Sequence, residues 1–171
     1  MILNNMKIKS GKSSVGCSIF VASKFSVSEQ GEALSDESFN LVENIVTTKK
    51  QISNFKNIKF EITQNIRFPK INEVDFFIIF NNLLNVCIEI CEKIKNVNNR
   101  FISVQYSENK NFFMYKIFCS KTKKFDLMCE QKSQKQKEKL LIAQKIINKH
   151  RGRIEIFCSL KVIFITFKFY T

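Results

Sequence analysis

The sequence predicts an α+β fold, a two-layer sandwich in which a mixed, mostly antiparallel sheet carries helices on one face. Three segments place apolar residues at helical spacing, and five segments alternate apolar with polar residues as half-buried strands do. Their order is α-β-α-β-β-α-β-β, and the consecutive strand pairs favour hairpins. With 171 residues, 44% of them hydrophobic and 18 of them Phe, the chain is large and apolar enough to bury one core.

The chain divides into two parts. Residues 1–34 form a segment without a recognisable element, and residues 35–171 form a globular domain. Ser35 is a suitable N-cap for a helix predicted over about 36–54, because the apolar residues that follow it recur at helical spacing. The segment 58–62 alternates apolar with polar residues, which predicts a half-buried strand.

The helix predicted over about 74–95 has the widest apolar stripe in the chain and should therefore lie in the core. A further helix is predicted over about 136–149, with Gly152 as a turn residue just past its end. Two hairpins complete the pattern: 101–107 with 112–119, and 153–159 with 161–170. One side of the last strand is strongly apolar, so we expect that face to pack on helices.

The chain carries 28 Lys and Arg against 15 Asp and Glu, a formal net charge of +13, which favours an acidic partner. Only four of the basic residues are Arg, the residue that contacts phosphate and guanine in bidentate fashion, so nucleic acid is the less favoured partner. Eleven basic residues stand against three acidic ones between 121 and 153. This stretch is either a solvated loop and helix face or a site for an anion or an acidic protein.

Six cysteines without a secretory signal indicate a reducing compartment, so we expect a cytoplasmic protein with free thiols. Cys87 and Cys91 are four residues apart on one helix face, and the only histidine, His150, is far away, which favours two core thiols and no metal site. No stretch reaches the roughly 18 apolar residues of a membrane span, so no transmembrane segment is expected.

Residues 82–94, NLLNVCIEICEKI, resemble the N-box helix of the GHKL or Bergerat-fold ATPase superfamily, commonly written NLLDNAIEACEKI. The segments 59–62, 74–80, 100–118 and 142–156 agree with the same pattern. Over about 40–171 the chain is similar to the catalytic ATP-binding domain of peptide-sensing sensor histidine kinases. The resemblance implies a Bergerat-like fold, a place in two-component signalling, and a segment 1–34 that is a remnant of a dimerisation hairpin.

In that family an Asn of the N-box helix holds Mg²⁺ on the nucleotide phosphates, and glycines at the start of the last helix expose backbone N–H groups to the phosphates. Here the first N-box asparagine is Asn82, but Val86 stands where the metal-holding Asn is expected. Asn85 is adjacent but turned by about 100° around the helix. Lys137 and Lys139 align with the two glycines, where a lysine would fill the space of a phosphate or bind it as a point charge.

The group that reads adenine in the family follows the first hairpin, where this chain has Cys119 and Ser120 without a glycine. Asn81 and Asn85 keep the N-box spacing of four residues one step out of register. Each lost polar contact costs about 1–3 kcal/mol, so three losses would move a micromolar ATP site to millimolar affinity or weaker. We therefore expect no catalytic residue and no resident cofactor or metal, with weak Mg-ATP binding as the alternative. The candidate binding residues are Asn82, Asn85, Lys137 and Lys139.

The resemblance then implies a degenerate binding module that partners a signalling protein of the kinase, phosphotransfer or response-regulator type, or a second copy of the chain as a homodimer. One alternative is an ATP-binding catalytic domain that phosphorylates a histidine in another chain. A second is a nucleic-acid binder that uses the basic stretch 121–153. His150 lies at the end of the last helix. We expect it to be a surface residue that interacts with the helix dipole and not a phosphoacceptor.

Overall fold

The computed structural model describes residues 37–63, 66–67, 69–123 and 134–170. The predictions for the segment 1–34 and for the Ser35 cap lie outside these residues. The helices and strands are α1 Glu37–Phe55, β1 Lys59–Ile62, α2 Glu73–Glu92, the short 3₁₀ helix η1 Val97–Asn99, β2 Phe101–Glu108, β3 Phe112–Ser120, α3 Gln134–Lys149, β4 Arg153–Cys158 and β5 Val162–Tyr170. The predicted order of helices and strands is confirmed.

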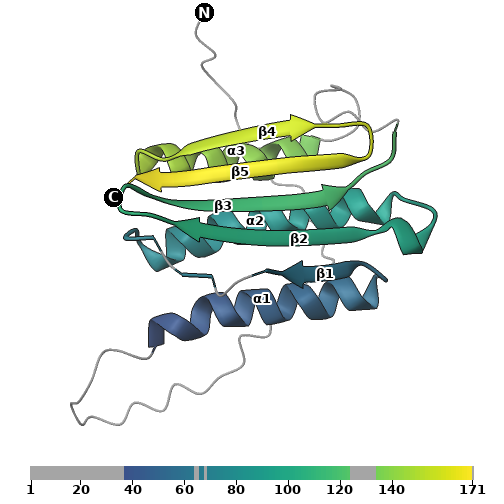
Figure 1. Cartoon of the computed structure of the whole chain (residues 1–171), viewed down its shortest axis with the longest axis horizontal. Helices are drawn as coiled ribbons and strands as arrows, with labels where there is room; N and C mark the ends of the chain where they lie inside the picture. The colour runs from purple at the N-terminus through teal and green to yellow at the C-terminus, as the bar shows by residue number, and fades with distance from the viewer. Residues whose placement is uncertain (1–36, 64–65, 68, 124–133, 171) are drawn as a thin grey trace, which may run out of the picture. The chain divides into compact units, whose positions relative to one another are not determined.

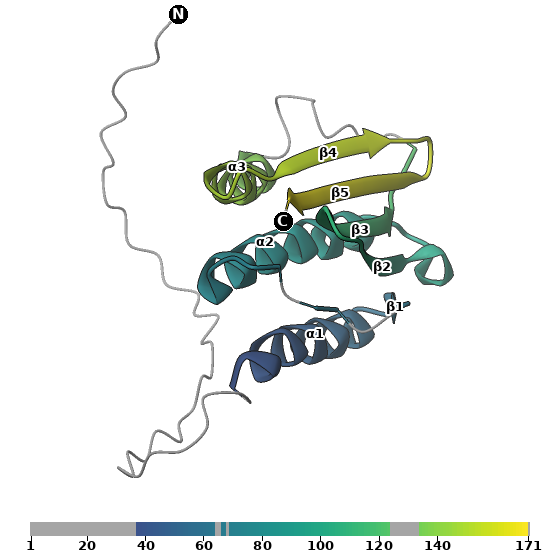
Figure 2. The same ribbon diagram turned by 60° about the vertical axis from the view of Figure 1, so that its left-hand side comes forward.

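The strands form one five-stranded sheet in the order β1-β2-β3-β5-β4 (Figure 1). β1 runs parallel to β2, and the other three pairings are antiparallel. The three helices lie on the same face of the sheet, with α2 behind the central strands in Figure 1 and all of them on one side in Figure 2. This is the predicted two-layer α+β arrangement.

The core lies between α2 and the central strands. On β5 the predicted apolar side is the buried one: Ile163, Ile165, Phe167 and Phe169 are at most 2% exposed. On α2 nearly every residue of the apolar stripe is fully buried as well. The rings of Tyr115 on β3 and Phe167 on β5 stack with centroids 4.8 Å apart beneath the helix.

Both ends of α2 are fixed by polar contacts. At the start, the Asn72 Oδ1 accepts hydrogen bonds from the backbone N–H groups of Val74 at 2.9 Å and Asp75 at 3.3 Å. At the other end, the Arg100 guanidinium donates to the carbonyls of Glu92, Ile94 and Lys56. The helix ends at Glu92, three residues before the predicted limit, and Arg100 binds the carbonyl of that last residue.

Among the described residues, α2 is the one helix long and apolar enough to cross a membrane by length and composition, with a mean hydropathy of 1.7. From the sequence no segment was expected to be long and apolar enough for a membrane span. In the fold, α2 packs against β2, β3 and both other helices. Its position in the core accounts for its apolar character.

Candidate functional site

One stripe of α2 faces α3 and forms the floor of the candidate site. Asp75, Asn82 and Glu89 are spaced by seven residues, which places them on the same side of the helix. Asp75 and Glu89 both contact α3, so the residues between them on the stripe, Asn82 and Val86, face it too. α3 therefore lies antiparallel along the predicted N-box helix.

The first of these contacts joins the start of α2 to the end of α3. The Asp75 carboxylate accepts from Lys149 Nζ at 2.7 Å and lies 2.6 Å from His150 Nε2. Hydrogen bonds from Lys149 and then from His150 hold the pKa of Asp75 below its ordinary value. The His150 side chain is only 19% exposed. The expectation of a surface histidine is therefore wrong, because Asp75 holds the imidazole against α2.

The second contact joins the end of α2 to the start of α3, where the Lys139 ammonium pairs with the Glu89 carboxylate. The two side chains are 17% and 30% exposed. Lys137 is half-buried but lies two residues earlier, about 200° away around α3, so the two predicted lysines do not converge. Of this predicted pair, Lys139 lies in the groove between the helices and is engaged by an acid of the N-box helix.

The two predicted asparagines point to different partners. The Asn82 Nδ2 donates to the Ile78 carbonyl of its own helix at 2.8 Å. The Asn85 Oδ1 accepts from Lys49 Nζ of α1 at 2.7 Å. Val86, at the position of the metal-holding Asn, is fully buried. Asn82 thus lies on the stripe that faces α3, whereas Asn85 is bound by Lys49 of α1.

Three residues of this region were not foreseen as candidates: Lys49, Glu89 and Gln136. Lys49 is 6% exposed, and its spacing of four from the buried Ile45 could have placed it on the inner face of α1. Gln136 at the start of α3 is 4% exposed, and its Oε1 has no hydrogen-bond partner among the described residues. A buried amide oxygen without a partner is costly, and no sequence pattern indicates it.

The expected position of the adenine reader faces the core. Cys119 is fully buried, and the Ser120 Oγ accepts from the Phe101 backbone N–H at 2.9 Å. The prediction of core thiols is confirmed for Cys87 and Cys91, both fully buried. Hydrogen bonding to Cys119, together with burial, raises the pKa of the Cys91 thiol. These groups are therefore parts of the core, and none of them is placed to contact a base.

Among residues 37–63, 66–67, 69–123 and 134–170, no three His, Cys, Asp or Glu side chains lie close enough together to hold a metal ion. The carboxylates on this side of α2 are instead paired with side chains of α3 and its end, Asp75 with Lys149 and with the His150 imidazole and Glu89 with Lys139. The described arrangement is thus a closed set of charge pairs that lies along one groove.

Comparison with known proteins gives one family and one fold. The sequence profile of the family described as GHKL domain matches residues 71–165, more than half of the chain. No curated protein matches the sequence.

Solved structures of histidine kinases share the fold. The catalytic domain of histidine kinase ThkA matches with a TM-score of 0.59 at 16% identity, over 76% of this chain and 90% of that one. The mycobacterial sensor histidine kinase MprB matches with a TM-score of 0.58 at 10% identity, over 75% and 95%. Full-length ShkA, solved in complex with AMPPNP, matches with a TM-score of 0.59 at 11% identity, over 78% of this chain and 30% of ShkA.

Proposed function

Because the chain belongs to the GHKL family, we propose that it is a degenerate histidine-kinase-type domain, a binding module of signal transduction that does not turn over ATP. The fold it shares with histidine kinase catalytic domains supports the first half of this proposal. The state of the groove between α2 and α3 supports the second.

The observation that carries the proposal is the pairing of Glu89 with Lys139 beside a buried Val86. Mg²⁺ in a nucleotide site takes oxygen ligands from the protein and from the phosphates. Val86, which stands where the resemblance implies the metal-holding Asn, offers none. The residues present therefore do not fit Mg-ATP held in the family's manner.

In this site the Lys139 ammonium takes the place of a bound metal ion. Its ammonium satisfies Glu89 without a metal ion, and a metal would have to displace it. Separating two partly buried charges leaves each one poorly solvated, which opposes such an exchange. The module keeps the GHKL scaffold while the groove is closed by the chain's own side chains.

A signalling protein of the kinase, phosphotransfer or response-regulator type is the partner this module would take, in the cytoplasm. A homodimer through a second copy is compatible with the same role. The second candidate function is that of an ATP-binding catalytic domain that phosphorylates a histidine in another chain, which the AMPPNP complex of ShkA favours. The basic stretch 121–153 is a weaker candidate for nucleic acid, because Lys139 and Lys149 in it are already paired with acids of α2.

Thermal unfolding of the purified chain with increasing Mg-ATP tests the proposal. A ligand at about 100 times its Kd stabilises the folded state by about 2.7 kcal/mol, which shifts the melting temperature by several degrees. We expect no such shift at sub-millimolar Mg-ATP. A shift of that size, abolished by EDTA, would show a working Mg-ATP site and would replace the binding module by the catalytic alternative.

A further inference from the structure

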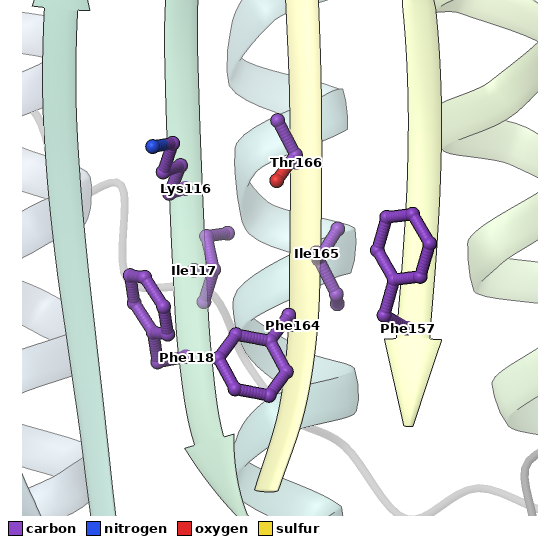
Figure 3. Close-up of a pocket in the computed structure, with 7 residues that line it drawn as sticks. All are labelled: Lys116, Ile117, Phe118, Phe157, Phe164, Ile165 and Thr166. Atoms are coloured by element: carbon purple, nitrogen blue, oxygen red, sulfur yellow. The ribbon is translucent and has the colours of Figure 1, made fainter. Parts of the chain in front are cut away.

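The face of the sheet opposite the helices contains an aromatic hollow of about 350 Å³. Its walls are the rings of Phe118 on β3, Phe164 on β5 and Phe157 on β4, with Lys116 and Thr166 along one side (Figure 3). It shares no residue with the groove between α2 and α3. The aromatic hollow is therefore a second feature of the fold that the nucleotide scaffold does not explain.

The three phenylalanines stand in one row across three neighbouring strands. Phe118 pairs with Phe164 in the register of β3 and β5, and Phe164 pairs with Phe157 in that of β4 and β5. Phe157 is 60% exposed, and Leu160 in the adjoining turn is 75% exposed. The solvated face of an antiparallel sheet normally carries polar residues, so a contiguous aromatic patch there indicates a surface that binds another molecule.

The charges around the hollow select the kind of partner. Two acids of this face are already paired within their own strands, Glu61 with Lys59 and Glu155 with Arg153. Lys116, which lines the hollow, has no acidic partner among the described residues. Its ammonium adds to a chain of net charge +13. The complement of the hollow is therefore an apolar side chain with carboxylates beside it.

We propose that the aromatic hollow is the docking site of an acidic protein segment, which inserts one apolar side chain between Phe118, Phe157 and Phe164 and sets a carboxylate against Lys116. This inference rests on the proposed function, since it names the surface by which the binding module takes its signalling partner. Enclosed pockets filled by one anchor residue are the usual centres of such interfaces.

The ring geometry favours a peptide over nucleic acid. The rings of Phe118 and Phe164 meet edge to face, with centroids 5.2 Å apart and planes at 78°. Single-stranded nucleic acid binds to flat ring faces on which successive bases stack. Two perpendicular rings form the walls of a hollow and offer no continuous stacking surface, so an inserted side chain fits them better than a row of bases.

Fluorescence anisotropy with labelled short acidic peptides tests the proposal on the full chain. The probes share their Asp and Glu residues and differ only in a central Phe, Leu or Ser. We expect the Phe and Leu peptides to bind and the Ser peptide to bind at least about tenfold more weakly, since burying one large apolar side chain contributes about 1.5–3 kcal/mol. Phe164→Ser and Lys116→Glu should each weaken the Phe peptide by about tenfold or more.

Two matched controls separate the hollow from general charge and apolarity. Phe55→Ser changes a phenylalanine that is 89% exposed at the end of α1, and Lys95→Glu changes an exposed lysine beyond α2. Neither should alter peptide binding. The proposal is overturned if no probe binds at about 1 mM, or if the controls weaken binding as much as the hollow variants do. It is also overturned if a labelled single-stranded oligonucleotide binds more tightly than the peptides and is the ligand lost in Phe164→Ser.

Mg-ATP melting on the same samples keeps the two proposals apart. Peptide binding together with an Mg-ATP shift would contradict the degenerate function and leave the docking site standing. Absence of peptide binding without an Mg-ATP shift would remove the docking site alone.

Discussion

The Lys139 ammonium of α3 is paired with the Glu89 carboxylate of α2, at a position where the resemblance to the GHKL family implied a glycine. At the opposite end of the same two helices, Asp75 binds His150 and Lys149. The two contacts hold α3 along the N-box stripe from end to end. Two sets of charged contacts thus join α2 to α3.

Restoring the family's residues should restore ligand affinity. In the double variant Val86→Asn with Lys139→Ala, an amide oxygen returns to the metal position and Glu89 is released. We expect Mg-ATP to bind this variant at least about tenfold more tightly than the wild type, since one good polar contact is worth about 1–3 kcal/mol. Calorimetric titration measures the affinity for Mg-ATP. Lys145→Ala, which changes an exposed lysine of the same helix, is the control. Equal affinities would place the defect elsewhere in the groove.

Asn85 should serve stability and not ligand binding. Asn85→Leu removes an acceptor from the buried Lys49 ammonium and should destabilise the fold by about 1–3 kcal/mol. Lys49→Met in the same background removes the buried charge and should recover much of that loss. Urea unfolding of the two single variants and the double variant gives the coupling free energy between Asn85 and Lys49. Additive effects would show that the two side chains do not depend on each other.

The Asp75 pairing predicts a pH dependence with a definite sign. Its folded pKa lies below the ordinary value of 3.8, so its contribution is complete above that pH and is lost as the pH falls through the folded pKa. The wild type should exceed Asp75→Asn in stability by about 0.5–1 kcal/mol near neutral pH, a range typical of partly exposed pairs. The difference should shrink below about pH 4. A difference that does not shrink as the pH falls below about 4 would contradict the pairing.

Two neighbouring residues after α3 should respond in opposite directions. A Cβ at Gly152 would lie 2.5 Å from the Lys168 carbonyl oxygen, so Gly152→Ala should destabilise the fold by about 1–3 kcal/mol. Arg151 has a φ of 55°, which suits glycine, so Arg151→Gly should be neutral or stabilising by up to about 1 kcal/mol. Thermal unfolding compares them. Equal losses of stability in both variants would contradict the described backbone conformation at Arg151 and Gly152.

The fold was predictable because apolar residues recur at regular spacing along its helices and strands. The buried side of β5 and the wide stripe of α2 follow directly from residue spacing, and both are confirmed. The end of α2 was not predictable, since it depends on the Arg100 guanidinium, a contact from outside the helix. The spacing of residues within a helix does not reveal a contact from a residue outside that helix.

The candidate site was predictable only in part, for the same reason. Spacing along α2 placed Asn85 about 100° around the helix from Val86, but it did not indicate that Asn85 contacts Lys49 of α1. The partners of the site residues come from 36 residues away for Lys49 and Asn85, and from 50 residues away for Lys139 and Glu89. Pairings between helices arise from tertiary packing, and a single sequence does not encode them in any local period.

Titration of the isotopically labelled chain with Mg-AMPPNP, followed by NMR through the backbone amides, tests the central claim most directly. The proposed function predicts that the amides of Asn82 and Glu89 show no saturable shift at sub-millimolar nucleotide, because Glu89 is paired with Lys139. Saturable shifts along this stripe, with a sub-millimolar Kd and dependence on Mg²⁺, would contradict the account.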